Sequence, residues 1–120
     1  MSENKVTGAI GERYAAEYLQ SHGFRIIEMN ANSRWGELDI VAEKEGKIIF
    51  VEVKTRSNTL KGKPYEAVSY GKLKRVYRTI QHYILVHELE KRAHRLDVIG
   101  IVLNPDKSVQ ELKHFENVGF

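Results

Sequence analysis

The sequence predicts a single α/β domain, spanning residues 1–120, in which a mixed β-sheet is flanked by helices. Two segments with helical periodicity are separated by three segments typical of strands, and one or two more strands follow the second helix. This order is unlike the regular alternation of a Rossmann fold. The length suits one domain, and the absence of cysteine excludes a disulfide scaffold and a thiolate metal site.

The first predicted helix begins at Thr7, whose side chain can cap it, and runs to about His22. Gly23 follows directly and is placed to end the helix. Apolar residues repeat along one side of this segment, and Gly8 and Gly11 lie within the same stripe. We therefore expect the backbone to approach its packing partner closely at both glycines.

Three extended segments come next. Residues 24–30 predict a short strand, residues 34–43 show a period-two pattern, and residues 47–55 are rich in β-branched and aromatic residues. Residues 45–47 (Glu-Gly-Lys) predict a hairpin turn between the second and third strands. In the second strand, Leu38, Ile40 and Ala42 alternate with Glu37, Asp39 and Val41 and are predicted to share one face.

The second half of the chain predicts a loop, a helix and two strands. Residues 56–67 are polar and contain glycine and proline, which indicates the loop. Ser69 is a candidate cap for a helix that ends near Glu90. Residues 95–103 predict another strand, and residues 108–115 predict a last one.

Basic residues are concentrated in one part of the chain. Between Lys61 and Arg95 there are nine Lys and Arg residues and three Glu residues, so this segment carries +6 and the remainder carries −3. Such polarity suits a polyanionic partner, with nucleic acid first, although a solvated basic helix face would look the same. The candidate nucleic-acid-binding residues are Arg56, Lys61, Lys72 and Arg75.

A second group of residues predicts metal chemistry. Glu52 and Lys54 lie on one face of the third strand, about 7 Å apart along it. The predicted hairpin places Asp39 opposite residues 52–53, where the two carboxylates would repel each other. Bound Mg²⁺ or Mn²⁺ would relieve that repulsion, and Glu12 at the edge of the first helix would add a further carboxylate.

These residues predict a site for metal-assisted hydrolysis of a phosphodiester bond, in which Lys54 would orient the attacking water or offset charge on the phosphate. Two alternatives stay open at this point. The domain could bind nucleic acid without turnover, as a binding or adaptor module. Asp39, Glu52 and Lys54 could also form only a salt-bridge network.

Several motifs resemble, in order along the chain, the bacterial YraN-like family of predicted endonuclease-related proteins. They are GAIGE at residues 8–12, GELDIV at 36–41, FVEVKTR at 50–56 and RLDV at 95–98. That family is similar to a branch of the PD-(D/E)xK nuclease superfamily, near the archaeal Holliday junction resolvases. Leu38 stands where the superfamily name expects proline, which is ordinary for the YraN-like branch.

The resemblance implies a restriction-endonuclease-like core with the element order α-β-β-β-α-β-(β). It implies that Asp39, Glu52 and the carbonyl of Val53 hold the metal, that Lys54 assists the attacking water, and that Glu12 helps to complete the acidic cluster. The superfamily contains DNA nucleases, RNA nucleases and members that only bind, and the leading hypothesis is a DNA substrate, branched or otherwise structured.

Other features concern partners and location. No apolar stretch approaches the length that crosses a bilayer, and the first residues lack the apolar core of a signal peptide, so we expect a cytoplasmic protein without a membrane partner. We expect no organic cofactor. One such domain cuts one strand, so a symmetric substrate would require a homodimer. Trp35 is expected to be a buried anchor rather than a base-stacking residue.

Overall fold

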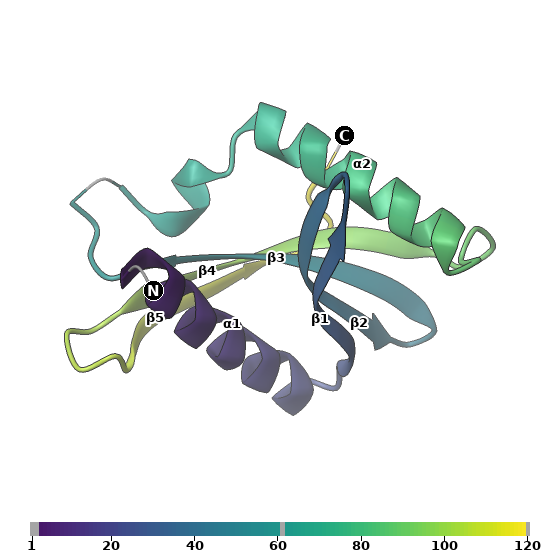
Figure 1. The fold of residues 1–120 in the computed structure, drawn as a ribbon. Helices are drawn as coiled ribbons and strands as arrows, with labels where there is room; N and C mark the ends of the chain where they lie inside the picture. Colours follow the sequence, from purple (N-terminus) through teal and green to yellow (C-terminus); the bar gives the residue numbers. More distant parts are fainter. Residues whose placement is uncertain (1–2, 61, 120) are drawn as a thin grey trace.

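A computed structural model describes residues 3–60 and 62–119 of the chain. Its strands form one five-stranded mixed sheet in the order β1-β2-β3-β4-β5, in which only β3 and β4 are parallel. Helices α1 and α2 lie on opposite sides of this sheet (Figure 1). The predicted α/β class and mixed sheet are confirmed. The elements are α1 (Glu3–Ser21), β1 (Arg25–Ser33), β2 (Gly36–Lys44), β3 (Lys47–Arg56), the 3-10 helix η1 (Pro64–Ala67), α2 (Tyr70–Val86), β4 (His94–Leu103) and β5 (Val109–Phe115).

Helix α1 ends where the sequence predicts but begins earlier. It starts at Glu3, and Thr7 is a buried residue inside the helix, so the prediction that Thr7 caps it is wrong. Residues 3–6 contain neither glycine nor proline, and nothing in them opposes an additional turn. At the other end Gly23 has a φ of 87°, and the N–H of Phe24 donates to the carbonyl of Leu19 at 2.9 Å. This is a Schellman ending.

Helix α2 ends at Val86, one turn before the predicted end near Glu90. Glu88 adopts a left-handed conformation with a φ of 54°, and the N–H of Leu89 donates to the carbonyl of Ile84 at 2.9 Å. The helix therefore also closes with a Schellman motif, although a glutamate occupies the position that glycine usually takes. Because no glycine marks this end, the sequence pattern overestimates the length of the helix.

Two apolar clusters pack on the two faces of the sheet. The α1 cluster joins Ala15 and Leu19 of the helix to one face, and the α2 cluster joins Val76, Ile80 and Ile84 to the other. Strand β3 supplies both clusters by strict alternation. Its α1-cluster residues are Ile49, Val51 and Val53, and its α2-cluster residues are Ile48 and Phe50.

Strand β2 does not keep the predicted alternation. Ile40 and Ala42 pack in the α1 cluster, but Leu38 packs in the α2 cluster, so the three residues do not share one face. The switch occurs at Asp39. On the adjacent strand β1, between the partners of Ile40 and Leu38, Asn30 has a left-handed φ of 53°. The side chains of β2 therefore change from one face of the sheet to the other at this point. The end of the β1–β2 hairpin bends towards α2 (Figure 1).

The tip of the same hairpin differs from the sequence prediction as well. Arg34 and Trp35 are not the start of a strand; they form a two-residue turn between Ser33 and Gly36, whose φ is 138°. The hydroxyl of Thr79 on α2 donates to the carbonyl of Trp35 at 3.0 Å and holds the tip against the helix. The Trp35 side chain is 42% exposed, so the prediction of a buried anchor is wrong.

The remaining elements follow the predictions closely. The predicted loop contains one turn of helix, η1, and the last strand forms against β4. Within residues 3–60 and 62–119, no helix combines the length and the apolar character that crossing a bilayer requires.

Candidate metal and nucleic-acid site

The candidate site lies where β2 separates from β3. The paired ladder between these strands ends at Ile40 and Val51. Beyond it, the N–H of Val53 has no strand partner on this side and donates instead to Oδ2 of Asp39 at 2.8 Å. Because the N–H and C=O of one residue point to the same edge of a strand, the Val53 carbonyl is directed to this edge as well. The predicted proximity of Asp39 to residues 52–53 is confirmed.

Glu52 is buried beside Asp39. Its residue exposure is 7%, and its carboxyl interacts with that of Asp39. Nζ of Lys72 lies 3.5 Å from Oε1 of Glu52. The side chain of Ser69 accepts the N–H of Lys72 at 3.2 Å, which confirms Ser69 as the cap and fixes the first turn of α2 over β3. Lys72, predicted only to contact phosphate, therefore also balances a carboxylate of the site.

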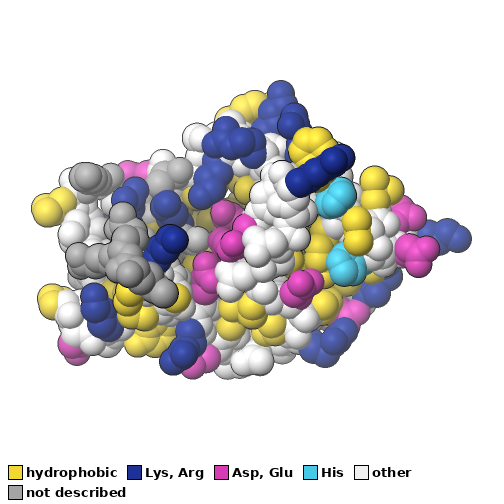
Figure 2. Space-filling view, viewed as in Figure 1, with side chains coloured by type: hydrophobic (Ala, Val, Ile, Leu, Met, Phe, Trp, Pro, Cys, Tyr) yellow, Lys and Arg dark blue, Asp and Glu magenta, His cyan; other side chains and the backbone are white. Residues whose placement is uncertain are grey.

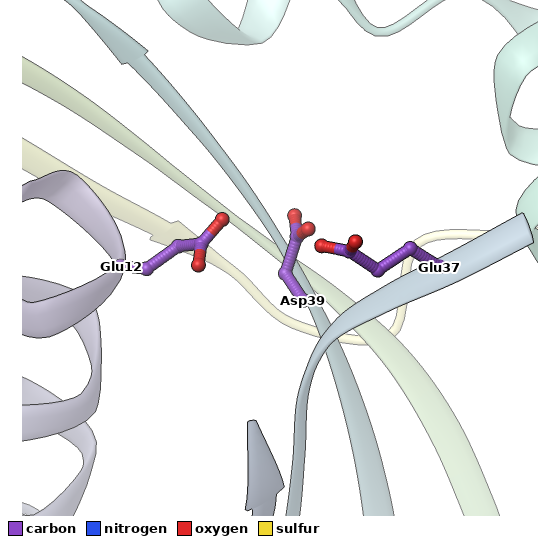
Figure 3. Close-up of side chains that lie close together, drawn as sticks. All are labelled: Glu12, Glu37 and Asp39. Carbon is purple, nitrogen blue, oxygen red and sulfur yellow. The ribbon is translucent and has the colours of Figure 1, made fainter. Parts of the chain in front are cut away.

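The carboxylates of Glu12, Glu37 and Asp39 lie close together. Glu12 reaches Asp39 from α1, and Glu37 reaches it along β2 from the other side (Figure 3). One oxygen from each of Glu12, Glu37 and Asp39 lies within 4.8 Å of the others. The sequence prediction missed Glu37. Its signal was the spacing of two residues from Asp39 within the period-two segment.

Gly11 explains how α1 brings Glu12 to this position. A Cβ atom at Gly11 would lie 1.8 Å from Oγ1 of Thr55 and 2.8 Å from its Cβ, so the helix backbone touches β3 here. The predicted close approach is confirmed at Gly11. It is wrong at Gly8, where a Cβ atom would meet nothing within 4 Å.

Three carboxyl groups of the site, those of Glu12, Asp39 and Glu52, are harder to ionise than free carboxyl groups. Burial, with the nearby charge of Asp39, raises the pKa of Glu12 from 4.5 to about 7. Burial and the same neighbour raise the pKa of Glu52 to about 8, against the opposing effect of Lys72. Burial likewise raises the pKa of Asp39, although the N–H of Val53 acts in the opposite direction. A divalent cation bound among these groups would favour their ionised forms.

Basic residues border the acidic cluster on the α2 side. Burial lowers the pKa of Lys54, and the charges of Lys72 and Arg56 add to that effect. Nε of Arg56 is buried without a hydrogen-bond partner within the described part of the chain. Arg75 is exposed on α2, and Lys61 lies outside the described residues. Figure 2 shows acidic side chains gathered in the middle of one face with Lys and Arg side chains above them, over α2.

Glu12, Asp39, Glu52 and Lys54 thus meet in one place, with one difference of grouping. The expected metal ligands were Asp39, Glu52 and the Val53 carbonyl. The three carboxylates with oxygens mutually within 4.8 Å are those of Asp39, Glu12 and Glu37, while Glu52 contacts both Asp39 and Lys72. A groove of about 340 Å³ between α1 and β1 runs beside Glu12, and its lining includes Arg13, Gln20, Met29 and Asn30.

The raised pKa values make the stability of the metal-free protein depend on pH. In the unfolded chain both carboxyl groups have the usual pKa of about 4.5, whereas in the folded protein the pKa is about 7 for Glu12 and about 8 for Glu52. Between these pH values the folded protein holds protons that the unfolded chain has released. The unfolding free energy therefore falls as pH rises through this window. We expect the melting temperature in EDTA to fall by several degrees from about pH 5.5 to about pH 8.5.

Two controls accompany this measurement. Glu52→Gln removes one of the groups whose pKa is raised, so its melting temperature should fall less over the same range. Saturating Mg²⁺ should also reduce the fall in the unaltered protein. An identical pH dependence in Glu52→Gln and in the unaltered protein would contradict the burial of an uncompensated carboxyl at this position.

Residues 11–101 of the chain match the family described as uncharacterised protein family UPF0102. Relatives cover nearly the whole chain. A UPF0102 protein of Caldanaerobacter subterraneus subsp. tengcongensis is 37% identical over 114 residues, which are 94% of this chain and 93% of the relative. One from Desulforamulus reducens is 39% identical over 96% of both chains. One from Persephonella marina is 40% identical over 82% of this chain and 85% of its own. None of these three names states an activity.

Proposed function

This chain belongs to the uncharacterised protein family UPF0102, and we propose that it is a metal-dependent endonuclease that hydrolyses phosphodiester bonds in DNA, including branched or otherwise structured DNA. The observation that carries the proposal is the convergence of Glu12, Glu37, Asp39 and Glu52 beside Lys54. The family agrees with the resemblance drawn from the motifs. The relation to PD-(D/E)xK nucleases, and the restriction-endonuclease-like core that it implies, are part of the proposal and are supported by the order of the elements.

The donor set fits a hard divalent cation such as Mg²⁺ or Mn²⁺. All the side chains involved offer carboxylate oxygens. Burial and the charge of Asp39 raise the pKa values of Glu12 and Glu52, and a bound cation would offset both effects. Asp39 and Glu52 would hold the ion with the Val53 carbonyl, and Glu12 and Glu37 would complete the acidic cluster. The bound ion would supply Lewis-acid stabilisation of the charge that builds on the phosphate during attack.

The lysines would act on the phosphate and on the attacking water. In hydrolysis a water oxygen bonds to phosphorus, the bond from phosphorus to the leaving sugar oxygen breaks, and negative charge increases on the phosphate oxygens. Lys54 would orient the water by a hydrogen bond and offset part of that charge. Lys72 would add a second positive charge at the same place, because α2 holds its ammonium 3.5 Å from Glu52.

The proposal is tested by incubating the purified protein with supercoiled plasmid, single-stranded DNA and a four-way junction, with Mg²⁺, with Mn²⁺ or with EDTA. We expect cleavage of at least one substrate with metal and none in EDTA. Calorimetry should detect binding of Mg²⁺ in the absence of DNA. DNA binding that is indifferent to metal, with no cleavage of any substrate, would replace the proposal by the non-catalytic binding module.

The basic side of the site should control the salt dependence of DNA binding. Plotted as log K against log salt, DNA binding has a negative slope. Arg75→Gln is expected to make this slope shallower by about 0.7–0.9, the value of one phosphate contact. Lys47→Gln serves as the control, because Lys47 is an exposed cation at the opposite end of β3 from Lys54. Fluorescence anisotropy over a salt series measures both. Equal slopes for the two variants would contradict a phosphate contact at Arg75.

A further inference from the structure

Trp35 is an exposed aromatic residue at the tip of the β1–β2 hairpin, and the structure holds it in place without burying it. Its side chain is 42% exposed, and it is not a member of either apolar cluster. Two hydrogen bonds fix its backbone: its N–H donates to the hydroxyl of Ser33 at 3.1 Å, and its carbonyl accepts from Thr79. A tryptophan on a fixed turn loses little further freedom when it binds a ligand.

Two cations lie over the ring. The guanidinium carbon of Arg34 is 5.0 Å from the ring centroid, and that of Arg78 on α2 is 5.7 Å from it, so both make cation-π contacts with the indole. The ring of His82 makes an edge contact with a centroid distance of 6.5 Å. Within the described part of the chain, neither Arg34 nor Arg78 forms an ion pair with a carboxylate. The exposed indole is therefore accompanied by two positive charges that remain available to an anion.

The tip is also close to the proposed metal site. Trp35 lies in the turn that precedes β2, two residues before Glu37, so their Cα atoms are at most about 7 Å apart. Glu37 is one of the carboxylates that converge on Asp39. The nucleotides that flank a base on the indole would therefore lie near the acidic cluster.

We propose that Trp35 stacks on an unpaired base of the DNA substrate, and that Arg34 and Arg78 leave the face of the ring to bind the phosphates that flank this base. The inference rests on the proposed function for the identity of the polymer. An aromatic ring bordered by cations matches single-stranded nucleic acid, because each nucleotide offers a π-face next to a phosphate. In a continuous duplex the faces of the bases are covered by their neighbours. The substrate class of the site is therefore DNA with a single-stranded or unpaired segment next to the scissile phosphate.

The chain offers a direct probe, because Trp35 is its only tryptophan. Its fluorescence is recorded in EDTA, where no cleavage is expected, during titration with an oligothymidylate strand and, separately, with a blunt duplex of equal length. Anisotropy of the labelled DNA measures binding independently. We expect the single strand to quench the emission with the same midpoint as the anisotropy curve. The duplex should bind without comparable quenching.

Two matched variants separate stacking from packing. Trp35→Tyr keeps an aromatic face and should bind the single strand within a few-fold of the unaltered protein. Trp35→Leu keeps an apolar side chain but removes the face, and should weaken single-strand binding by between about 5-fold and 100-fold while leaving duplex binding unchanged. Equal melting temperatures for the two variants would show that weaker binding by Trp35→Leu is not caused by unfolding. The quenching measurement needs no variant and is independent of this control.

Each outcome decides a separate question. Single-strand binding without a change in Trp35 emission, or equal affinity in Trp35→Leu, would overturn the stacking proposal even if the protein cleaves DNA. Quenching by the single strand in a protein that cleaves no substrate would overturn the nuclease proposal and leave the stacking role supported. An RNA strand of equal length that binds more tightly and quenches more strongly than the DNA strand would overturn the assignment to DNA.

Discussion

Replacement of Asp39 by asparagine is expected to reduce DNA cleavage by about 10³-fold or more while the protein stays folded. Asparagine keeps an oxygen that accepts the N–H of Val53, so the bond at 2.8 Å that closes the gap between β2 and β3 has a replacement. The substitution removes the negative charge around which Glu12, Glu37 and Glu52 are arranged. Affinity for the cation and stabilisation of the reacting phosphate should therefore be lost together.

The measurement compares cleavage rates and calorimetric Mg²⁺ binding for the two proteins, with the melting temperature in EDTA as a check on folding. Glu17→Gln is the matched control, because it removes one carboxylate from an exposed position of α1, the helix that carries Glu12. It should leave cleavage and Mg²⁺ binding unchanged. Substantial metal-dependent cleavage by Asp39→Asn, at a rate within ten-fold of the unaltered protein, would exclude Asp39 from the proposed role.

Substitution of Gly11 by alanine is expected to destabilise the protein by about 1–3 kcal/mol and to weaken the site as well. The new Cβ would overlap both Oγ1 and Cβ of Thr55, and because Cβ of Thr55 is attached directly to the backbone of β3, rotation of its side chain does not relieve the overlap. Helix α1 must then move away from the sheet. Glu12 is the next residue on that helix and would move away from Asp39.

Gly8→Ala is the control for this prediction. It makes the same chemical change in the same helix, but at a position where the added atom meets nothing within 4 Å. Alanine is the better helix former, so this variant should be more stable than the unaltered protein by up to about 1 kcal/mol. Chemical denaturation of both variants measures the difference, and Mg²⁺ titration reports on the site. A Gly11→Ala protein with unchanged stability and Mg²⁺ affinity would contradict the close contact of α1 with β3.

Local patterns predicted several features that depend only on neighbouring residues. The hairpin register that brings Asp39 to residues 52–53 depends on the turn at residues 45–47 and on the alternation of β3, and both are visible in the sequence. The cap at Ser69 and the ending at Gly23 depend on side chains and backbone freedom within one turn of helix. These features place Glu52 and Lys54 on one strand with a carboxylate opposite them.

The features that sequence patterns did not predict have different causes. Helix α2 closes on a left-handed glutamate, a local conformation that glutamate does not favour. Other features depend on contacts between distant segments, and one is the change of face at Asp39, which breaks the period-two rule. Trp35 was expected to be buried because large aromatic residues usually are. Its exposure follows from the bend of the hairpin towards α2 and from the hydrogen bond between its carbonyl and Thr79. These two residues are 44 positions apart along the chain.

Three things follow from the amino-acid sequence alone. They are the order of the elements, the positions of the acidic and basic residues along the chain, and the family. The convergence of Glu37 and Glu12 on Asp39, the pairing of Lys72 with Glu52 and the position of the indole beside two arginines required the folded molecule. The physical reason is the range of the interactions. Hydrogen bonds of turns and the periodicity of side chains act within a few residues, whereas burial, which raises the pKa values of Glu12 and Glu52, depends on how whole elements pack.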